Sequence, residues 1–161
     1  MQTAAEILRT KGQEVWSVEP GETILHAIKL MANHEVGALL VMENDKLIGI
    51  VSERDYARKV ILKGLSSKDV KISEVMTRDV VSVSQDHTVK ECMVLMNEKE
   101  IRHLPVLDDG ELVGMVSVRD MVDCIIEEQV ATIGNLQSYT RSFLLIGLAI
   151  VMTVVVLLIA S

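Results

Sequence analysis

The chain of 161 residues has a formal net charge of −7 and is rich in aliphatic residues and methionine. This charge argues against a nucleic-acid partner, because non-specific affinity for a phosphate backbone comes from clustered Lys and Arg, and the sequence has no basic stripe. The length suffices for one domain of ordinary size or for two small repeats that share a core.

The cysteines and histidines predict no structural metal centre. Cys92 and Cys124 both lie among apolar residues, and their spacing matches neither a zinc motif nor a redox motif. We therefore expect buried thiols in a reducing compartment. The four histidines are scattered along the chain and pair with no cysteine, so the sequence offers no zinc-type ligand set.

The chain begins with a polar segment, residues 1–14, that we expect to form a helix. It lacks the basic start and apolar middle of a secretory signal. Residues 15–60 then align with residues 80–125 without a gap, with many identical residues and many exchanges of one aliphatic residue for another. A match of this length indicates a duplication, which we divide into a first repeat, 15–64, and a second repeat, 80–128.

The order of predicted elements is the same in both repeats. The strands EVWSV and DVVSV lead to helices that begin near Thr23 and Thr88, where TVKE forms a capping box in the second copy. Two strands joined by the polar turns ENDK and DDGE follow, and then a second helix. The expected fold class is therefore α+β, with two β-α-β-β-α repeats. One repeat alone buries little core, and packing two face to face creates a cleft between them.

The last part of the chain differs in composition. Residues 65–79 join the repeats, with KGLSSKD as the polar linker, and residues 129–142 connect the second repeat to an uncharged run, 143–160. As a helix this run would span about 27 Å, close to the hydrocarbon thickness of a bilayer. We expect a single-pass C-terminal transmembrane helix that leaves the folded domain in the cytoplasm, since no export signal precedes it. The alternative is a helix buried in a protein or dimer core, although no polar face interrupts the run.

Each repeat carries the motif Gly-apolar-Val-Ser-x-Arg-Asp, from Gly49 to Asp55 and from Gly114 to Asp120. Locally the motif fits a helix start, with Ser as the N-cap and Asp at the third helical position. This interpretation explains the Ser and the Asp. It explains neither the Arg nor the constant spacing from the Gly.

The second interpretation is that each motif forms half of a ligand site. A helix start with free backbone N–H groups suits a phosphate, and the Ser hydroxyl and the Arg guanidinium would add donors. The Asp carboxylate would repel a phosphate but can accept both hydroxyls of a ribose, and the aliphatic strands can enclose a base. The motif thus predicts a nucleotide site. The candidate residues are Ser52, Arg54, Asp55, Ser117, Arg119 and Asp120.

The two motifs, the linker sequence ISEVMT, the segment IRHLPVLDDGELVG and the tandem duplication together resemble a pair of CBS domains, often called a Bateman module. The resemblance covers residues 1 to about 130. It implies two repeats packed with pseudo-twofold symmetry that commonly form homodimers. It also implies an adenosine-containing ligand in the clefts, namely AMP, ADP, ATP, NAD or S-adenosylmethionine.

The resemblance also implies roles for single residues. The two motif aspartates would hold the ribose, the motif serines would lie near the ribose-phosphate, and Arg102 and His103 would reach phosphates. Gly37 and Ala38 replace the latter two in the first repeat, so the two clefts are expected to be unequal. The alternative role for His103 is a hydrogen-bonded residue at a strand start. Base contacts would come from Trp16, Ser17, Val18, Val80, Val81 and Ser82.

The sequence has no nucleophile-base pair, P-loop, glycine-rich dinucleotide fingerprint or metal cluster, so we do not expect an enzyme. The leading hypothesis is a membrane-tethered regulatory module, without an obligatory cofactor, that senses an adenine nucleotide through a population shift. The alternative is a ligand-independent dimerisation module that the tail recruits to a membrane protein partner. In that case the motifs are helix caps and nothing more.

Overall fold

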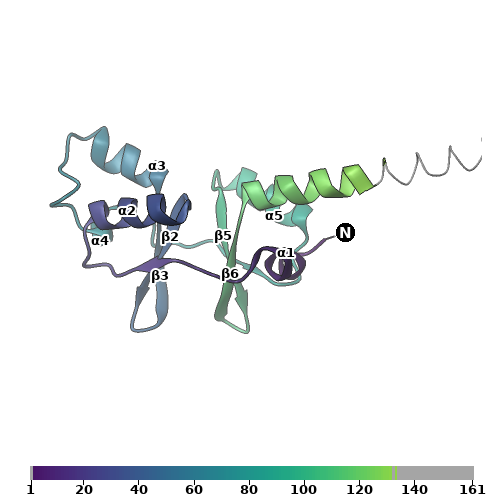
Figure 1. Ribbon diagram of the computed structural model, residues 1–161. Coiled ribbons are helices and arrows are strands. Elements are labelled where there is room, and N and C mark those ends of the chain that lie inside the picture. The colour runs from purple at the N-terminus through teal and green to yellow at the C-terminus, as the bar shows by residue number, and fades with distance from the viewer. Residues whose placement is uncertain (1, 132, 134–161) are drawn as a thin grey trace, which may run out of the picture. The chain divides into compact units, whose positions relative to one another are not determined.

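A computed structural model describes residues 2–131 and 133 of the chain (Figure 1). The chain divides into two compact units, Met1–Met121 and Val122–Ser161. The first unit contains two three-stranded sheets and the helices named below. The described residues of the second unit are helical, in the same helix that begins at Val118.

The first sheet has the strand order β1-β2-β3, with β1 parallel to β2 and β2 antiparallel to β3. In the turn between β2 and β3, Asn44 and Asp45 adopt φ of 49° and 60°. Short polar side chains tolerate this conformation, so the hairpin predicted at ENDK is confirmed. The elements of this repeat are β1 (Ser17–Val18), α2 (Ile24–His34), β2 (Ala38–Glu43), β3 (Lys46–Ser52), α3 (Glu53–Tyr56) and the π-helical turn η1 (Ala57–Ile61).

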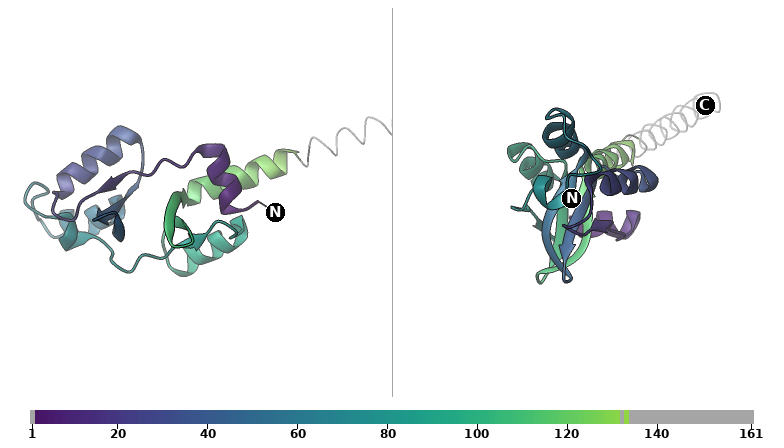
Figure 2. Two further views of the ribbon diagram at one scale, coloured as in Figure 1. Left: turned by 90° about the horizontal axis from the view of Figure 1, so that it is seen from below. Right: turned by 90° about the vertical axis from the view of Figure 1, so that its left-hand side faces the viewer.

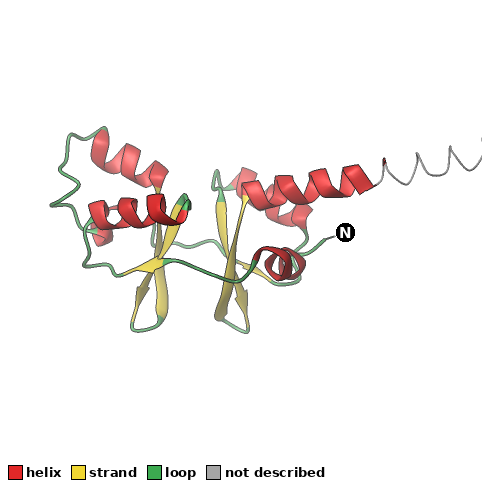
Figure 3. Ribbon diagram, viewed as in Figure 1, coloured by secondary structure: helices red, strands yellow, loops and turns green. Residues whose placement is uncertain are grey.

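The second sheet repeats the first in order and register, as β4-β5-β6 (Figure 3). The register of the hairpin shifts between Val41 and Met42 in the first copy and between Val106 and Leu107 in the second, which are aligned positions. The predicted α+β fold of two repeats is therefore confirmed. Its elements are β4 (Val83–Ser84), α5 (Val89–Glu98), β5 (His103–Asp108), β6 (Glu111–Ser117) and the helix from Val118.

The first strand of each repeat is shorter than the five residues predicted. Only Ser17–Val18 and Val83–Ser84 have strand geometry. Each is an edge strand that pairs with one neighbour over two residues. The predicted helix starts are confirmed. The hydroxyl of Thr23 accepts a hydrogen bond from the backbone of His26, and Thr88 forms the expected capping box with Glu91.

The linker contains a short helix that the sequence did not predict, α4 (Ile72–Val75). Val70, Ile72, Val75 and Met76 are buried in the same core cluster as the helices and strands of the first repeat. The polar part of the linker, KGLSSKD, therefore ends where the chain enters the core of the first repeat. Four helical residues are too few to show an apolar periodicity in the sequence.

The segments that precede the repeats are exchanged between them. The N-terminal helix α1 (Ala4–Lys11) contacts β6 of the second repeat (Figure 1, Figure 2). In the turn after β4, the carbonyl of His87 accepts a hydrogen bond from the backbone of Ala4 at 2.8 Å. In the same way, the segment before α4 completes the first repeat, where the backbone of Ile24 donates to the carbonyl of Val70 at 2.9 Å. Each repeat is thus closed by residues that precede the other.

This exchange explains the glycine of the repeated motif. A Cβ atom on Gly114 would lie 2.6 Å from Cδ2 of Leu8 in α1, and one on Gly49 would lie 2.7 Å from Sδ of Met76 after α4. Such distances are far below van der Waals contact. The glycines therefore allow α1 and the segment after α4 to approach the sheets.

The predicted transmembrane helix, 143–160, lies outside the described residues, as does most of the predicted connector, 129–142. Within residues 2–131 and 133, no helix combines the length and the apolar character needed to cross a bilayer.

Candidate functional site

A cavity of about 510 Å³ opens beside the first motif. Its walls come from the helix start at 52–55, from residues 79–81 before β4, and from residues 99–103 between α5 and β5. Both repeats therefore contribute to it, as predicted for a cleft between them. The volume lies in the range of cavities that bind small molecules.

Ser52 and Asp55 form a closed capping box at the edge of this cavity. Oδ2 of Asp55 accepts hydrogen bonds from the backbone N–H of Ser52 at 3.0 Å and from its hydroxyl at 2.6 Å. Oδ1 of Asp55 pairs with Nζ of Lys59 at 2.7 Å, and that ammonium also donates to the carbonyl of Val75 at 2.6 Å. The Asp55 side chain is 15% exposed. The helix-start interpretation of the motif is thus correct, and the carboxylate still lines the cavity.

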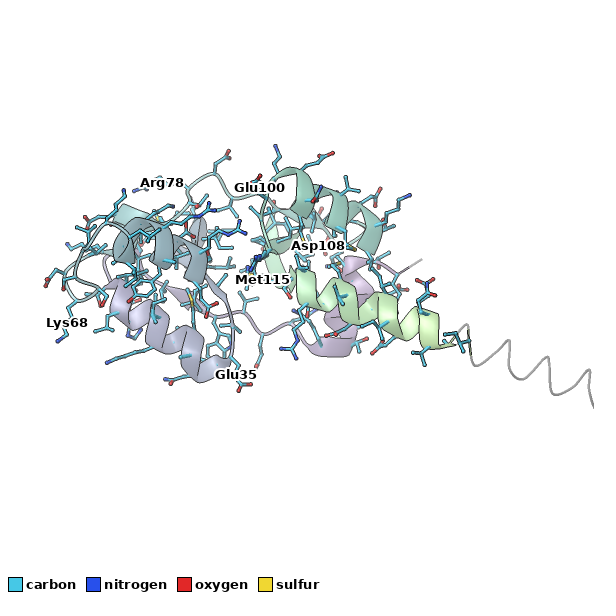
Figure 4. All side chains as sticks on the ribbon, turned by 90° about the horizontal axis from the view of Figure 1, so that it is seen from above. Glu35, Lys68, Arg78, Glu100, Asp108 and Met115 are labelled. Carbon is cyan, nitrogen blue, oxygen red and sulfur yellow. The ribbon has the colours of Figure 1, made fainter. Side chains whose placement is uncertain are left out.

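Arg54 makes a contact that the sequence did not predict. Its Nη1 donates a hydrogen bond to the backbone carbonyl of Glu100 at 2.6 Å. Glu100 adopts a positive φ of 53° in the turn after α5, at the edge of the second repeat that faces the first (Figure 4). The guanidinium lines the cavity, but it also ties the helix start of one repeat to a turn of the other.

Arg102 and His103 line the same cavity as Asp55, so the structure brings together the carboxylate and the phosphate-side residues named from the sequence. The imidazole of His103 is half-buried and lies over Gly37, where a Cβ would be 3.5 Å from the ring. Burial lowers the pKa of His103, and the charges of Lys11 and Arg102 act in the same direction, while Asp120 opposes them. His103 is therefore a neutral side chain at neutral pH.

The residues named as base contacts separate into two groups. Val80 and Val81 line the cavity. The indole of Trp16 instead stacks on the imidazole of His34, with ring centroids 3.4 Å apart, and Val18 is buried in the core of the first repeat. Ser17 and Ser82 are not among the residues that line this cavity.

The second motif builds the same cap elsewhere. Oδ2 of Asp120 accepts hydrogen bonds from the backbone N–H of Ser117 at 2.6 Å and from its hydroxyl at 2.8 Å. The same oxygen also accepts a hydrogen bond from Nζ of Lys11, at the end of α1, at 2.7 Å. Ser117, Arg119 and Asp120 are not part of the cavity beside the first motif.

Comparison with known proteins identifies the family. A model of the CBS domain matches residues 4–62 and again residues 72–127. The chain belongs to the CBS domain family. It carries two CBS domains in tandem, as the motifs indicated.

Several CBS proteins are similar over most of their length. The mitochondrial CBS domain-containing protein CBSX3 of Arabidopsis thaliana is 35% identical over 149 residues, which cover 86% of this chain and 72% of that protein. A CBS-domain protein of Burkholderia ambifaria has a solved structure that is 46% identical, with a TM-score of 0.78, over 80% of this chain and 96% of that one. The CBS domain pair of protein MJ0100, solved with 5′-methylthioadenosine and S-adenosylmethionine, is 25% identical with a TM-score of 0.70, over 80% of this chain and 98% of that one.

Proposed function

We propose that the tandem CBS pair is a regulatory module, not an enzyme, and that it binds an adenosine-containing ligand in the cavity beside the first motif. The observation that carries this proposal is the gathering of Asp55, Val80, Val81, Arg102 and His103 around one cavity of about 510 Å³. The relative solved with 5′-methylthioadenosine and S-adenosylmethionine supports the ligand class.

Each wall of the cavity has chemistry that suits one part of such a ligand. The ribose hydroxyls would donate to Asp55, in place of the ammonium of Lys59, which keeps its second partner at the carbonyl of Val75. The base would lie against Val80 and Val81. Phosphates or another charged group would face the cationic residues of the lining, Arg58, Lys99 and Arg102, with the neutral His103 beside them.

Regulation would follow from the position of the ligand between the repeats. A ligand that contacts both the first motif and the turn before β5 favours whichever arrangement of the repeats fits it better. The size of the response is limited by the difference between its affinities for the two arrangements. The hydrogen bond from Arg54 to Glu100 crosses the same boundary, so the unliganded arrangement is itself held by a specific contact.

A second candidate function is a ligand-independent interaction module. The closed capping boxes favour it, because Asp55 and Asp120 each already have a lysine partner. Exposed apolar side chains on η1 and α5 offer a surface for a second copy of the chain, and a homodimer fits either function. These side chains are Ile61, Met93 and Val94, with Leu62 directly after η1.

From the apolar run 143–160 we propose that a single C-terminal span attaches the chain to a membrane. The CBS pair would lie on the cytoplasmic side, and a membrane protein could be the target of its regulation. Extraction of membranes at alkaline pH tests it. The full-length chain should stay with the bilayer, and a chain that ends at residue 142 should be released. Release of both would overturn the attachment.

Calorimetric titration of the full-length chain in mild detergent with AMP, ATP, NAD and S-adenosylmethionine tests ligand binding. Asp55→Asn should weaken binding by about 10- to 100-fold, because hydrogen bonds to a charged group contribute about 1.5–3 kcal/mol. The matched control is Asp45→Asn in the hairpin turn, which removes the same charge from the same repeat and should bind normally. Absence of heat with every ligand at millimolar concentration would leave the ligand-independent module as the function.

A further inference from the structure

The two motifs differ in the element that supplies a cation to the aspartate. Asp55 pairs with Lys59, four residues later in its own helix. The aligned position in the second repeat is Cys124, which cannot do this. Asp120 instead pairs with Lys11, which is 109 residues away and lies at the end of α1.

Lys11 is held in place by a docked helix. Beyond the backbone hydrogen bond from Ala4 to His87, the backbone of Ala5 donates to the carbonyl of Gln85 at 3.0 Å, and Leu8 fills the space above Gly114. α1 lies beside β6, as Figure 2 shows. The ammonium of Lys11 is therefore held near Asp120 by a helix that is bonded to the turn after β4 and packed on β6.

The matching position at the first motif carries the opposite charge. Leu8 above Gly114 corresponds to Met76 above Gly49. Three residues after each of these lie Lys11 and Asp79. Asp79 lines the cavity of the first motif, whereas Lys11 is bonded to the carboxylate of the second.

The consequence is that Asp120 is already saturated on one oxygen. Its Oδ2 accepts from the backbone and hydroxyl of Ser117 and from Lys11, and its side chain is only 18% exposed. A ribose hydroxyl that bonds this oxygen would have to replace an ammonium, and a neutral donor bonds a carboxylate less strongly than a charged one does. Gly37 and Ala38 align with Arg102 and His103, so the first repeat offers the second motif neither a guanidinium nor an imidazole at these positions.

We propose that Lys11 is a latch by which α1 keeps the second motif closed, so that the chain binds one adenosine ligand and the second motif opens only when the end of α1 moves away. This inference rests on the proposed function for its ligand, but the latch itself is a property of the unliganded chain. The two parts are therefore tested by different measurements.

Hydrogen exchange of the full-length chain in mild detergent, without ligand, tests the latch. Lys11→Met keeps the aliphatic stem and removes the charge, and Asp120→Asn removes the carboxylate. Both should speed amide exchange at the C-terminal end of α1 by about two- to fivefold, the range expected for one partly exposed ion pair. Lys11→Arg keeps the positive charge and should exchange as slowly as the wild type. Asp55→Asn should not change the exchange of α1. Equal exchange in all variants would overturn the latch.

Titration of the same proteins with ATP and AMP tests its effect on binding. The wild type and Lys11→Arg should bind one nucleotide per chain, and Lys11→Met should bind two. The second site should disappear in the double variant Lys11→Met with Asp120→Asn. Two sites in the wild type, or one site in Lys11→Met, would overturn the proposal. If no variant binds a nucleotide, the proposed function fails, and the hydrogen-exchange result alone decides whether the latch exists.

Discussion

Nη1 of Arg54 donates a hydrogen bond to the carbonyl oxygen of Glu100 at 2.6 Å, which joins the first helix start to a turn of the second repeat. A guanidinium is suited to this role, because it is always charged and its donors are held in a fixed plane. The contact lies at the wall of the candidate cavity, so a residue that we named as a ligand contact also holds the repeats together.

Replacement of Arg54 should therefore lower the stability of the unliganded protein. Arg54→Ala should reduce the free energy of unfolding by about 1 kcal/mol, since the lost hydrogen bond is charged but exposed to solvent. Urea unfolding followed by the fluorescence of Trp16, the single tryptophan, measures the change. Arg9→Ala is the control, because its side chain is 72% exposed, and its stability should be within about 0.5 kcal/mol of the wild type. Equal stability of Arg54→Ala and the wild type would contradict a joining role.

A methyl group on Gly114 should collide with α1. Gly114→Ala should reduce the free energy of unfolding by about 1–3 kcal/mol, because the new Cβ would overlap Leu8 in a packed site. The combination with Leu8→Ala should restore part of the loss, so that the two effects are not additive. Gly21→Ala is the matched control, since the methyl group that it adds would have no atom within 4 Å. Strict additivity of Gly114→Ala and Leu8→Ala would show that the two residues do not share this space.

Acidification should destabilise the protein partly through His103. Burial lowers its folded-state pKa below the ordinary value of 6.5, so the unfolded chain binds the proton more readily. The associated stability is present above about pH 6.5 and is lost as the pH falls through the folded-state pKa. The fall in unfolding free energy between pH 7.5 and pH 5.5 should be smaller in His103→Gln than in the wild type. An equal fall in both proteins would contradict this contribution of His103.

Neither described cysteine should react readily in the folded protein. Burial raises the pKa of Cys92 to about 11, so almost none of it is thiolate at pH 8, and Cys124 is also buried. Ellman's reagent should therefore label the native chain slowly and both thiols rapidly after unfolding. Cys92→Ser shows which thiol accounts for any native labelling. Fast reaction of Cys92 in the native state would contradict its burial.

Local chemistry made the hairpins and helix starts predictable. Asn44 and Asp45 lie in a turn that favours such residues, and Thr88 with Glu91 forms a cap within one helical turn. Because the two repeats align without a gap, each element predicted in one repeat was supported by the same pattern in the other. The gathering of Asp55 with Arg102 and His103 in one cavity came from the family resemblance, since no local pattern connects these residues.

Long-range contacts account for what the sequence did not predict. The sequence did not explain the motif glycines, because the side chains that approach them, Leu8 and Met76, belong to α1 and to the segment after α4. Lys11 donates to Asp120, 109 residues away, and Arg54 donates to Glu100, 46 residues away. No periodicity or spacing in the sequence indicates either pair. The stacking of the Trp16 ring on His34 likewise joins two residues that no local pattern connects.

The exchange of α1 and the α4 segment has a consequence for synthesis on the ribosome. The core of the first repeat cannot be completed when residue 64 has emerged, because it awaits Val70 and Ile72 from downstream. The second sheet, in contrast, finds its missing helix already made. A cut after residue 64 would therefore remove Val70 and Ile72 from the first half and α1 from the second, so the two repeats form one folding unit.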